Sequence, residues 1–154
     1  MRLKNILFVV EDVEKSVEFY KELFGLQIVS QFDGNVILTE GLVLQERKGW
    51  EELTEHKVTY GNHDSELFFV ENDMDNFLGH LKKTRFGIEY VQPIMEHSWG
   101  QRVVRIYDPD HHVLEISEEL EGVVRKFLNQ GMTLEMIAVK MELPLEYIKD
   151  LIGQ

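Results

Sequence analysis

The chain contains an internal repeat, and no other feature of the sequence limits its fold as strongly. In each half, one apolar stretch is followed by an amphipathic segment and then by three further short apolar stretches. The two copies lie about 60 residues apart, a spacing typical of repeated supersecondary units. Alternating and helical spacings of the apolar residues distinguish strands from helices. The sequence therefore predicts an α+β fold with two β-α-β-β-β modules.

The first module is expected over about residues 3–47. Residues 3–10 are mostly apolar and include β-branched and aromatic side chains, which predicts a buried strand. Asp12 has the side chain of a helix N-cap and Gly25 is a typical helix stop, so a helix is expected between them. Three strands are expected next, near residues 26–32, 35–39 and 41–46, with a hairpin turn at Asp33-Gly34.

The second module is expected over about residues 64–117 and repeats the same order. Its elements are a strand at residues 67–71, a helix that starts at Asn72-Asp73 and ends before Gly87, and strands near residues 88–95, 101–107 and 112–117. Between the modules, residues 48–64 are polar with isolated aromatic side chains. This segment fits either a mobile lid over a cavity or a connecting loop whose Trp50 packs on the edge of the sheet.

Beyond Ser117 the apolar spacing becomes helical. Three helices are expected there, at residues 119–130, at residues 133–141 with Thr133 as cap, and from Pro144 onward. The last two resemble a helix-turn-helix unit, but the final helix is acidic, whereas a DNA-reading helix carries basic and amide side chains. We therefore expect a domain over residues 1–118 and a helical extension over residues 119–154 that packs against the domain or a partner subunit.

Composition excludes several classes of function. The formal net charge of −12 disfavours nucleic acid and anionic membrane surfaces as partners, because phosphate binding needs Lys and Arg. The absence of cysteine excludes disulfides, thiolate catalysis and cysteine-based metal sites. No apolar run approaches the roughly 20 residues that span a bilayer, and no signal peptide is visible. We expect a cytoplasmic protein that binds neither nucleic acid nor membranes.

Glu115 is the most informative single residue, because it lies within an otherwise apolar strand. A carboxylate in such a strand has to face a cavity, a partner charge or a metal, since an unpaired buried charge is too costly. In a functional interpretation it is a ligand or a general base. In a structural interpretation it pairs with Arg102 or Arg105 of the neighbouring strand, which lie three residues apart and therefore on opposite faces.

Two groups of residues carry a resemblance to a known family. The first is Val10-Glu11-Asp12-Val13-Glu14-Lys15-Ser16-Val17-Glu18-Phe19-Tyr20, followed by Leu23-Phe24-Gly25-Leu26. The second is Tyr107-Asp108-Pro109-Asp110 together with Glu115. Over about residues 3–117 the chain resembles the vicinal oxygen chelate superfamily, which includes glyoxalase I, bleomycin-resistance proteins and extradiol dioxygenases. The resemblance implies a cup-shaped mixed sheet made by paired modules, enclosing a site that usually holds a divalent metal.

The resemblance also implies where metal ligands would lie, on the first and last strand of each module. The corresponding residues are Asn5, Gln45, Glu66 and Glu115, and Ser65 replaces Glu66 if that strand slips by one residue. The set contains no histidine, unlike most sites of the superfamily. Two carboxylates and two carboxamides suit Mg²⁺ or Mn²⁺ better than Zn²⁺, with Ni²⁺ as a further candidate. A metal-free pocket lined by hydrogen-bonding groups is the favoured alternative.

Two functions follow from this set. The first is a small-molecule-binding protein that sequesters its ligand, with Gln45, Trp99, Arg102 and Arg105 as ligand-binding residues; an acidic protein suits a cationic ligand. The alternative is a glyoxalase-like, metal-dependent lyase or isomerase acting on an α-carbonyl compound or its thiol adduct, with Glu115 moving the proton. A third possibility is a regulatory protein that senses a ligand. We expect a homodimer, because symmetric pairing covers sheet edges.

Overall fold

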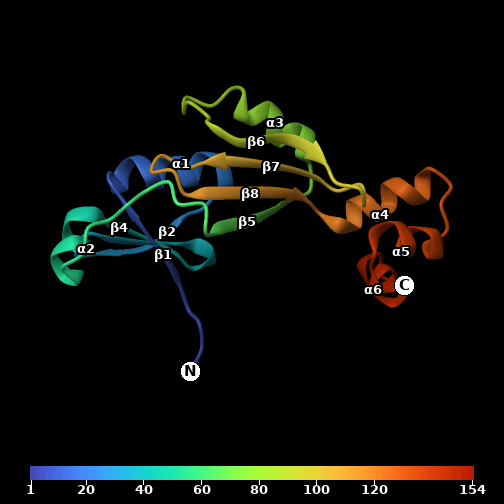
Figure 1. Cartoon of the computed structure of the whole chain (residues 1–154), viewed down its shortest axis with the longest axis horizontal. Helices are drawn as coiled ribbons and strands as arrows, with labels where there is room; N and C mark the ends of the chain where they lie inside the picture. Colours follow the sequence, from blue (N-terminus) through green and yellow to red (C-terminus); the bar gives the residue numbers. More distant parts are fainter. The chain divides into compact units, whose positions relative to one another are not determined.

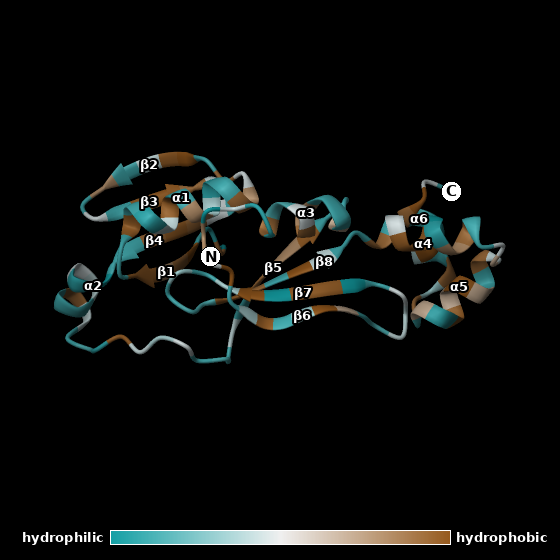
Figure 2. Cartoon of the chain, turned by 90° about the horizontal axis from the view of Figure 1, so that it is seen from above, coloured by the Kyte–Doolittle hydropathy of each residue, from teal (hydrophilic) through white to brown (hydrophobic).

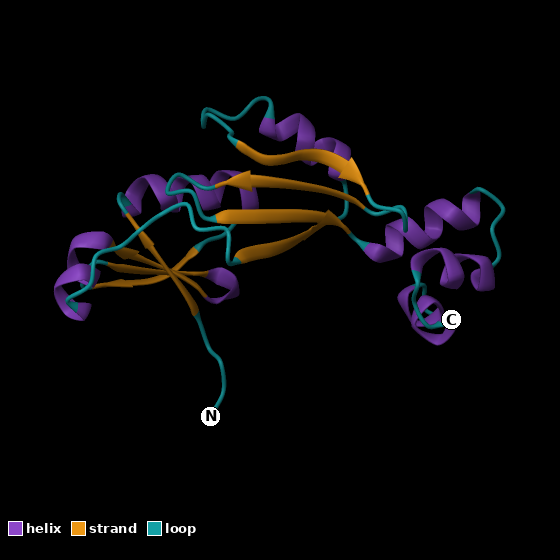
Figure 3. Cartoon of the chain, in the orientation of Figure 1, coloured by secondary structure: helices purple, strands orange, loops and turns teal.

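The structure is a computed structural model that describes all 154 residues, and it confirms the α+β class and the two predicted modules (Figure 1). The chain forms two compact units. Unit 1 comprises Met1–Ser65, His80–Glu89 and Tyr107–Val113, and unit 2 comprises Glu66–Gly79, Tyr90–Ile106 and Leu114–Gln154. Each unit contains one four-stranded sheet (Figure 3).

The sheet of unit 1 has the strand order β1-β4-β3-β2. Its elements are β1 (Ile6–Val10), α1 (Val13–Phe24), β2 (Ile28–Phe32), β3 (Asn35–Leu38), the short 3-10 helix η1 (Thr39–Gly41), β4 (Leu42–Glu46) and α2 (Arg47–Thr54). β1 runs parallel to β4, and the other pairs are antiparallel. Helix α1 packs against β3 and β4 and buries Phe19, Tyr20 and Leu23.

Local signals fix the ends of α1 and of the following hairpin as predicted. The Asp12 carboxylate accepts a hydrogen bond from the Lys15 backbone N–H at 3.0 Å, and Gly25 closes the helix in the left-handed conformation with φ 68°. Asp33 and Gly34 both have positive φ, 45° and 73°. Two consecutive positive φ angles are the geometry of a type I′ hairpin turn, which matches the twist of the flanking strands.

Two predictions in unit 1 are wrong. The first strand begins at Ile6 rather than at residue 3, and it is buried only at Val10, because β1 is the edge strand of its sheet. The segment between the modules is not a loop throughout, since its first part is helix α2. The Glu46 side chain caps this helix by accepting from the Gly49 N–H at 3.1 Å. Glutamate is an uncommon N-cap, and a glycine in the first turn lowers the helix propensity of the segment, so the sequence did not predict this helix.

The sheet of the second module has the order β5-β8-β7-β6. Its elements are β5 (Glu66–Glu71), α3 (Met74–Leu81), β6 (Tyr90–Glu96), β7 (Arg102–Tyr107) and β8 (Val113–Glu118). The inner strand β8 is buried from Val113 to Ser117. The edge strand β5 instead alternates between exposed and half-buried residues, which leaves one face of this strand open to solvent.

Three helices follow, as the sequence predicts: α4 (Leu120–Asn129), α5 (Leu134–Met141) and α6 (Leu145–Leu151). Thr133 caps α5 by accepting from the Met136 N–H at 3.3 Å. Each helix carries both apolar and polar residues (Figure 2). Their apolar residues form a core of their own, made by Val123, Val124, Phe127, Ile137, Met141 and Ile148.

None of the helices is both long enough and apolar enough to cross a membrane. The structure contains a single chain, so the expected homodimer stays a prediction.

Candidate functional site

The predicted site residues are divided between the two units. Asn5 and Gln45 belong to unit 1, and the others belong to unit 2: Glu66, Trp99, Arg102, Arg105 and Glu115. Within unit 1, Val9 is paired with Gln45 across the parallel strands, and Asn5 directly precedes β1. Alternation along the strand therefore puts Asn5, Val9 and Gln45 on one face of the sheet. The Asn5 side-chain NH₂ donates to the Gly41 carbonyl at 3.1 Å.

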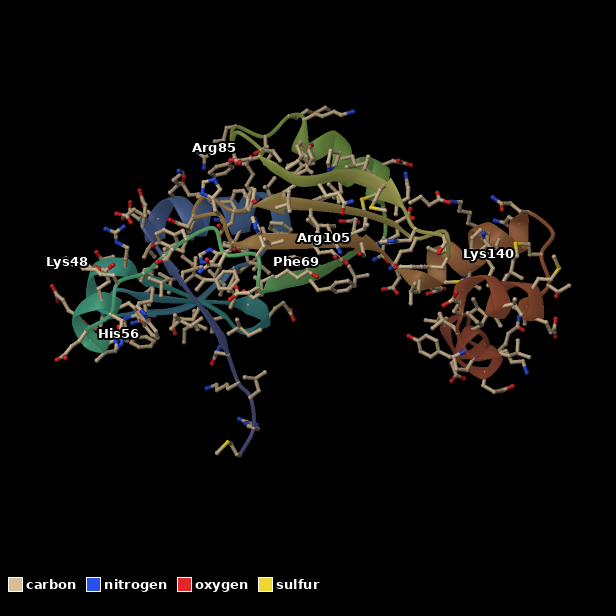
Figure 4. All side chains as sticks on the ribbon, viewed as in Figure 1. Lys48, His56, Phe69, Arg85, Arg105 and Lys140 are labelled. Atoms are coloured by element: carbon tan, nitrogen blue, oxygen red, sulfur yellow. The ribbon has the colours of Figure 1, made fainter.

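In unit 2 two of the predicted residues, Glu66 and Glu115, meet at a third, Arg105, which is labelled in Figure 4. Its Nη2 forms an ion pair with Glu115 Oε2. Its Nε lies 3.2 Å from Glu66 Oε2, and its Nη1 donates to Gln92 Oε1 at 2.9 Å. The other Glu115 oxygen accepts from the Ser117 hydroxyl at 2.9 Å. We call these five residues the Arg105 cluster.

Exposure differs within the Arg105 cluster. The side chain of Glu115 is 9% exposed, that of Arg105 25% and that of Glu66 39%. A nearly buried carboxylate is stable only with a partner, and Glu115 has a guanidinium on one oxygen and a hydroxyl on the other. Of the two arginines that the sequence left open as partners for Glu115, Arg105 is therefore the one that binds it.

Arg102 makes a separate set of contacts. Its Nε donates to Glu118 Oε1 at 2.7 Å, and its Nη1 donates to Asp75 Oδ1 at 2.7 Å. The hydrogen bonds that Arg102 donates to Glu118 and then to Asp75 raise its pKa further above its already high value. Arg102 and Arg105 share no partner, and only Arg105 binds Glu115. Arg102 joins β7 to the end of β8 and to α3.

Trp99 lies against the C-terminal helices. Its indole stacks on the His97 ring with centroids 4.1 Å apart and planes 7° apart. The indole N–H donates to Gln101 Oε1 at 3.0 Å, and the ring packs on the core formed by α4, α5 and α6. Through these contacts the Trp99 ring packs against the helical extension.

Sequence reasoning missed a buried polar network in unit 1, centred on Asp108. Its carboxylate accepts four hydrogen bonds: from the Tyr20 hydroxyl at 2.8 Å, from His112 Nδ1 at 2.8 Å, and from the backbone N–H groups of Asp110 and His112, each at 2.9 Å. Burial, and then the charge of Asp108, raises the pKa of Tyr20 well above 10.0. The available signal was Asp108-Pro109-Asp110, whose aspartates favour turns that bond their own backbone.

Asp110 continues this network to the start of α1. Its carboxylate accepts from the Glu11 N–H at 2.9 Å and from the Ser16 hydroxyl at 3.3 Å. The turn between β7 and β8 is thereby attached to the β1–α1 junction, two segments almost 100 residues apart in the chain (|i−j| = 99 for the first of these bonds).

The arrangement can now be compared with known proteins. A family model described as Glyoxalase-like domain matches residues 3–121. The chain belongs to this family. The resemblance to the vicinal oxygen chelate superfamily is therefore confirmed.

Individual relatives agree with this assignment. The uncharacterized protein YraH of Bacillus subtilis (strain 168) is 32% identical over 132 residues, which cover 78% of this chain and 100% of that protein. A protein of unknown function from Agrobacterium tumefaciens str. C58 has 30% identity and a TM-score of 0.64, over 77% of this chain and 94% of its own. A glyoxalase/bleomycin resistance protein/dioxygenase family enzyme from Burkholderia phytofirmans PsJN has the same fold, with 17% identity and a TM-score of 0.64 over 75% and 96% of the two chains.

For a glyoxalase-like domain, the fit of a divalent metal to the predicted set has to be judged from its donors. Both carboxylates of the set, Glu66 and Glu115, already bind the guanidinium of Arg105. A metal ion at these oxygens has to displace that cation, and Asn5 and Gln45 offer only neutral oxygens. No group of three or more His, Cys, Asp or Glu side chains is arranged to hold a metal. The donors therefore do not fit a divalent cation as they stand.

Asp110 of this glyoxalase-like chain gives a pH-dependent prediction. Burial raises the pKa of Asp110 above 3.8, and the nearby charge of Asp108 acts in the same direction. A carboxyl with a raised pKa stabilises the fold in its protonated form, so this contribution is complete below pH 3.8 and is lost as the pH rises through the raised pKa. Asp110→Asn cannot ionise, and its stability relative to the wild type should therefore increase from about pH 3.5 to about pH 7. Urea denaturation at both pH values checks this, and a constant difference contradicts it.

Proposed function

We propose that this glyoxalase-like protein binds a small cationic molecule, without a metal, at the Arg105 cluster. The observation that carries the proposal is the guanidinium of Arg105 on both carboxylates, Glu66 and Glu115. In this position an internal cation takes the place that a divalent metal would need. The cluster then supplies hydrogen-bonding groups to a ligand rather than ligands to a metal.

Apolar side chains beside the cluster support ligand binding. Phe68 and Val70 follow Glu66 at alternate positions of β5, so they share its open face. Their exposed fractions are 58% and 50%. Exposed apolar side chains that adjoin a few fixed polar groups are typical of ligand-binding surfaces.

The charge of the cluster supports a cationic ligand. Glu66 and Glu115 carry two negative charges against the single positive charge of Arg105. Glu66 is the more exposed carboxylate, and only one of its oxygens lies near Arg105, so it offers an acceptor to solvent. The net charge of −12 adds a long-range attraction for cations.

The alternative, a lyase that uses Glu115 as general base, has weaker support. One oxygen of Glu115 is ion-paired with Arg105, and the other accepts a hydrogen bond from Ser117. A general base has to offer a lone pair to the substrate proton at hydrogen-bond distance. Glu115 is also only 9% exposed, which leaves little of its carboxylate open to a substrate.

Isothermal titration calorimetry with bleomycin, as a cationic probe, tests the proposal. Glu66→Gln removes the exposed charge of the cluster and should weaken binding about two- to five-fold, as expected for one partly exposed charge pair. Asp75→Asn is the matched control, because Asp75 is an exposed carboxylate that contacts Arg102 rather than Arg105. Equal binding by the wild type and Glu66→Gln would contradict the proposal. Turnover of the methylglyoxal–glutathione adduct, dependent on Mg²⁺, Mn²⁺, Ni²⁺ or Zn²⁺, would favour the lyase instead.

A further inference from the structure

Unit 1 contains a cavity of about 370 Å³ along the free edge of β1. All of its lining residues belong to unit 1, whereas the Arg105 cluster belongs to unit 2. Its walls come from β1, from α2, from the segment between α2 and β5, and from the turn before β8. The volume lies within the range of small-molecule sites, which starts at about 300 Å³.

Aromatic rings form much of this wall. The ring of Phe8 stacks on that of His112, with centroids 4.1 Å apart and planes 11° apart. Tyr60 meets His112 edge-on at 6.0 Å, and Trp50 of α2 lines the same cavity. Rings prefer other rings in stacked or edge-on contact, so these walls suit an aromatic ligand.

The hydrogen bond to Asp108 selects the tautomer of a neutral His112. The carboxylate of Asp108 is a pure acceptor that also receives the Tyr20 hydroxyl, so His112 Nδ1 has to carry the hydrogen of their 2.8 Å bond. In a neutral imidazole the other nitrogen, Nε2, is then an acceptor. The ring is thereby held in one orientation, by Asp108 at its edge and by Phe8 on its face. A ligand that matches this site presents a donor.

The hydroxyl of Tyr60 is a second polar group of the wall that can bind a ligand. It is a buried side-chain oxygen without a hydrogen-bond partner, and such a group is costly unless a ligand or a water molecule binds it. Tyr60 lines this cavity and the adjoining one, beside Asp110 and Arg47. Burial, with the charges of Asp110 and Glu11, raises the pKa of Tyr60 to about 12, so the hydroxyl keeps its proton.

We infer that this cavity binds a small aromatic molecule that carries an N–H or O–H group. Its ring packs against Phe8, Trp50 and Tyr60, and its N–H or O–H group donates to Nε2 of His112. Neither the metal-ligand set nor the Arg105 cluster contributes a residue to this second site.

A pair of probes tests this inference on the full chain. Indole has the ring and the N–H donor, whereas 1-methylindole has the ring alone. With 5-fluorotryptophan incorporated, fluorine NMR observes Trp50 and Trp99 separately, and Trp99→Phe assigns the two signals. Indole should shift the Trp50 signal to saturation and leave Trp99 unchanged, with binding about five- to ten-fold tighter than for 1-methylindole. Equal affinities, or a shift at Trp99 alone, would overturn the inference.

A histidine variant separates the hydrogen bond from general packing. In His112→Asn the side-chain NH₂ can still donate to Asp108, but the Nε2 acceptor is lost. This variant should bind indole and 1-methylindole equally. His63→Asn is the control, because His63 contacts the Tyr107 hydroxyl and does not line the cavity, so it should keep the preference for indole. A preference retained in His112→Asn would show that the donor group binds elsewhere.

Discussion

Replacing Gly100 with alanine is expected to destabilise the protein by about 3 kcal/mol, from the summed cost of a left-handed backbone and an overpacked core. Gly100 has φ +89°, which a side chain disfavours. A Cβ atom there would lie 2.2 Å from Cζ of the Phe127 ring and 2.9 Å from Cε2. Phe127 is 4% exposed and sits in the core of α4, α5 and α6, with Lys140 Nζ 5.1 Å from its ring centroid. The ring therefore has little room to move aside.

Gly131→Ala is the matched control for this prediction. Gly131 has φ +86°, but a Cβ there meets nothing within 4 Å. Its cost should be that of the backbone alone, about 1 kcal/mol. Urea denaturation of both variants isolates the steric contribution as the difference between them. In a Phe127→Ala background, Gly100→Ala should cost no more than Gly131→Ala, and similar costs for the two glycines in the wild type would show that the ring does not restrict Gly100.

Arg105→Met is expected to lower stability by about 2–4 kcal/mol at neutral pH, because it leaves the nearly buried Glu115, and the more exposed Glu66, without their cation. The cost is placed below that of a fully buried pair because Arg105 is one-quarter exposed. Arg102→Met is the control. It lies on the same strand with a similar exposed fraction, 27% against 25%, but its partners Glu118 and Asp75 are 17% and 81% exposed, against 9% for Glu115. Its cost should be about 1 kcal/mol, as for more exposed pairs.

Two further measurements connect Arg105 to function. Adding Glu115→Gln to Arg105→Met should recover most of the lost stability, because no nearly buried charge is then left unpaired and Glu66 is 39% exposed. Arg105→Met alone should also gain a thermal shift with Mn²⁺ that the wild type lacks, since Glu66 and Glu115 become available to a metal. A wild-type response to Mn²⁺ as large as that of the variant would contradict Arg105 as the resident cation.

The sequence by itself determined the elements and their order. Asp12 and Gly25 end α1 through contacts within one helical turn, and Asp33-Gly34 set the hairpin through their own φ angles. Such local signals are readable because the interacting groups are neighbours in the chain. Helix α2 was not predicted from the sequence, because its N-cap is a glutamate and its first turn contains a glycine.

Contacts between distant segments were decided only by the tertiary structure. The alternation of β7 separates Arg102 from Arg105, but only the fold shows that Arg105 is the partner of Glu66 and Glu115. The Asp108 network depends on Tyr20, 88 residues away in the chain. The cavity beside β1 likewise needs α2 and the segment after it to pass along a strand edge. The physical reason is the same in each case: a partner far along the chain leaves no periodic or local trace, because its position is set by packing rather than by propensity.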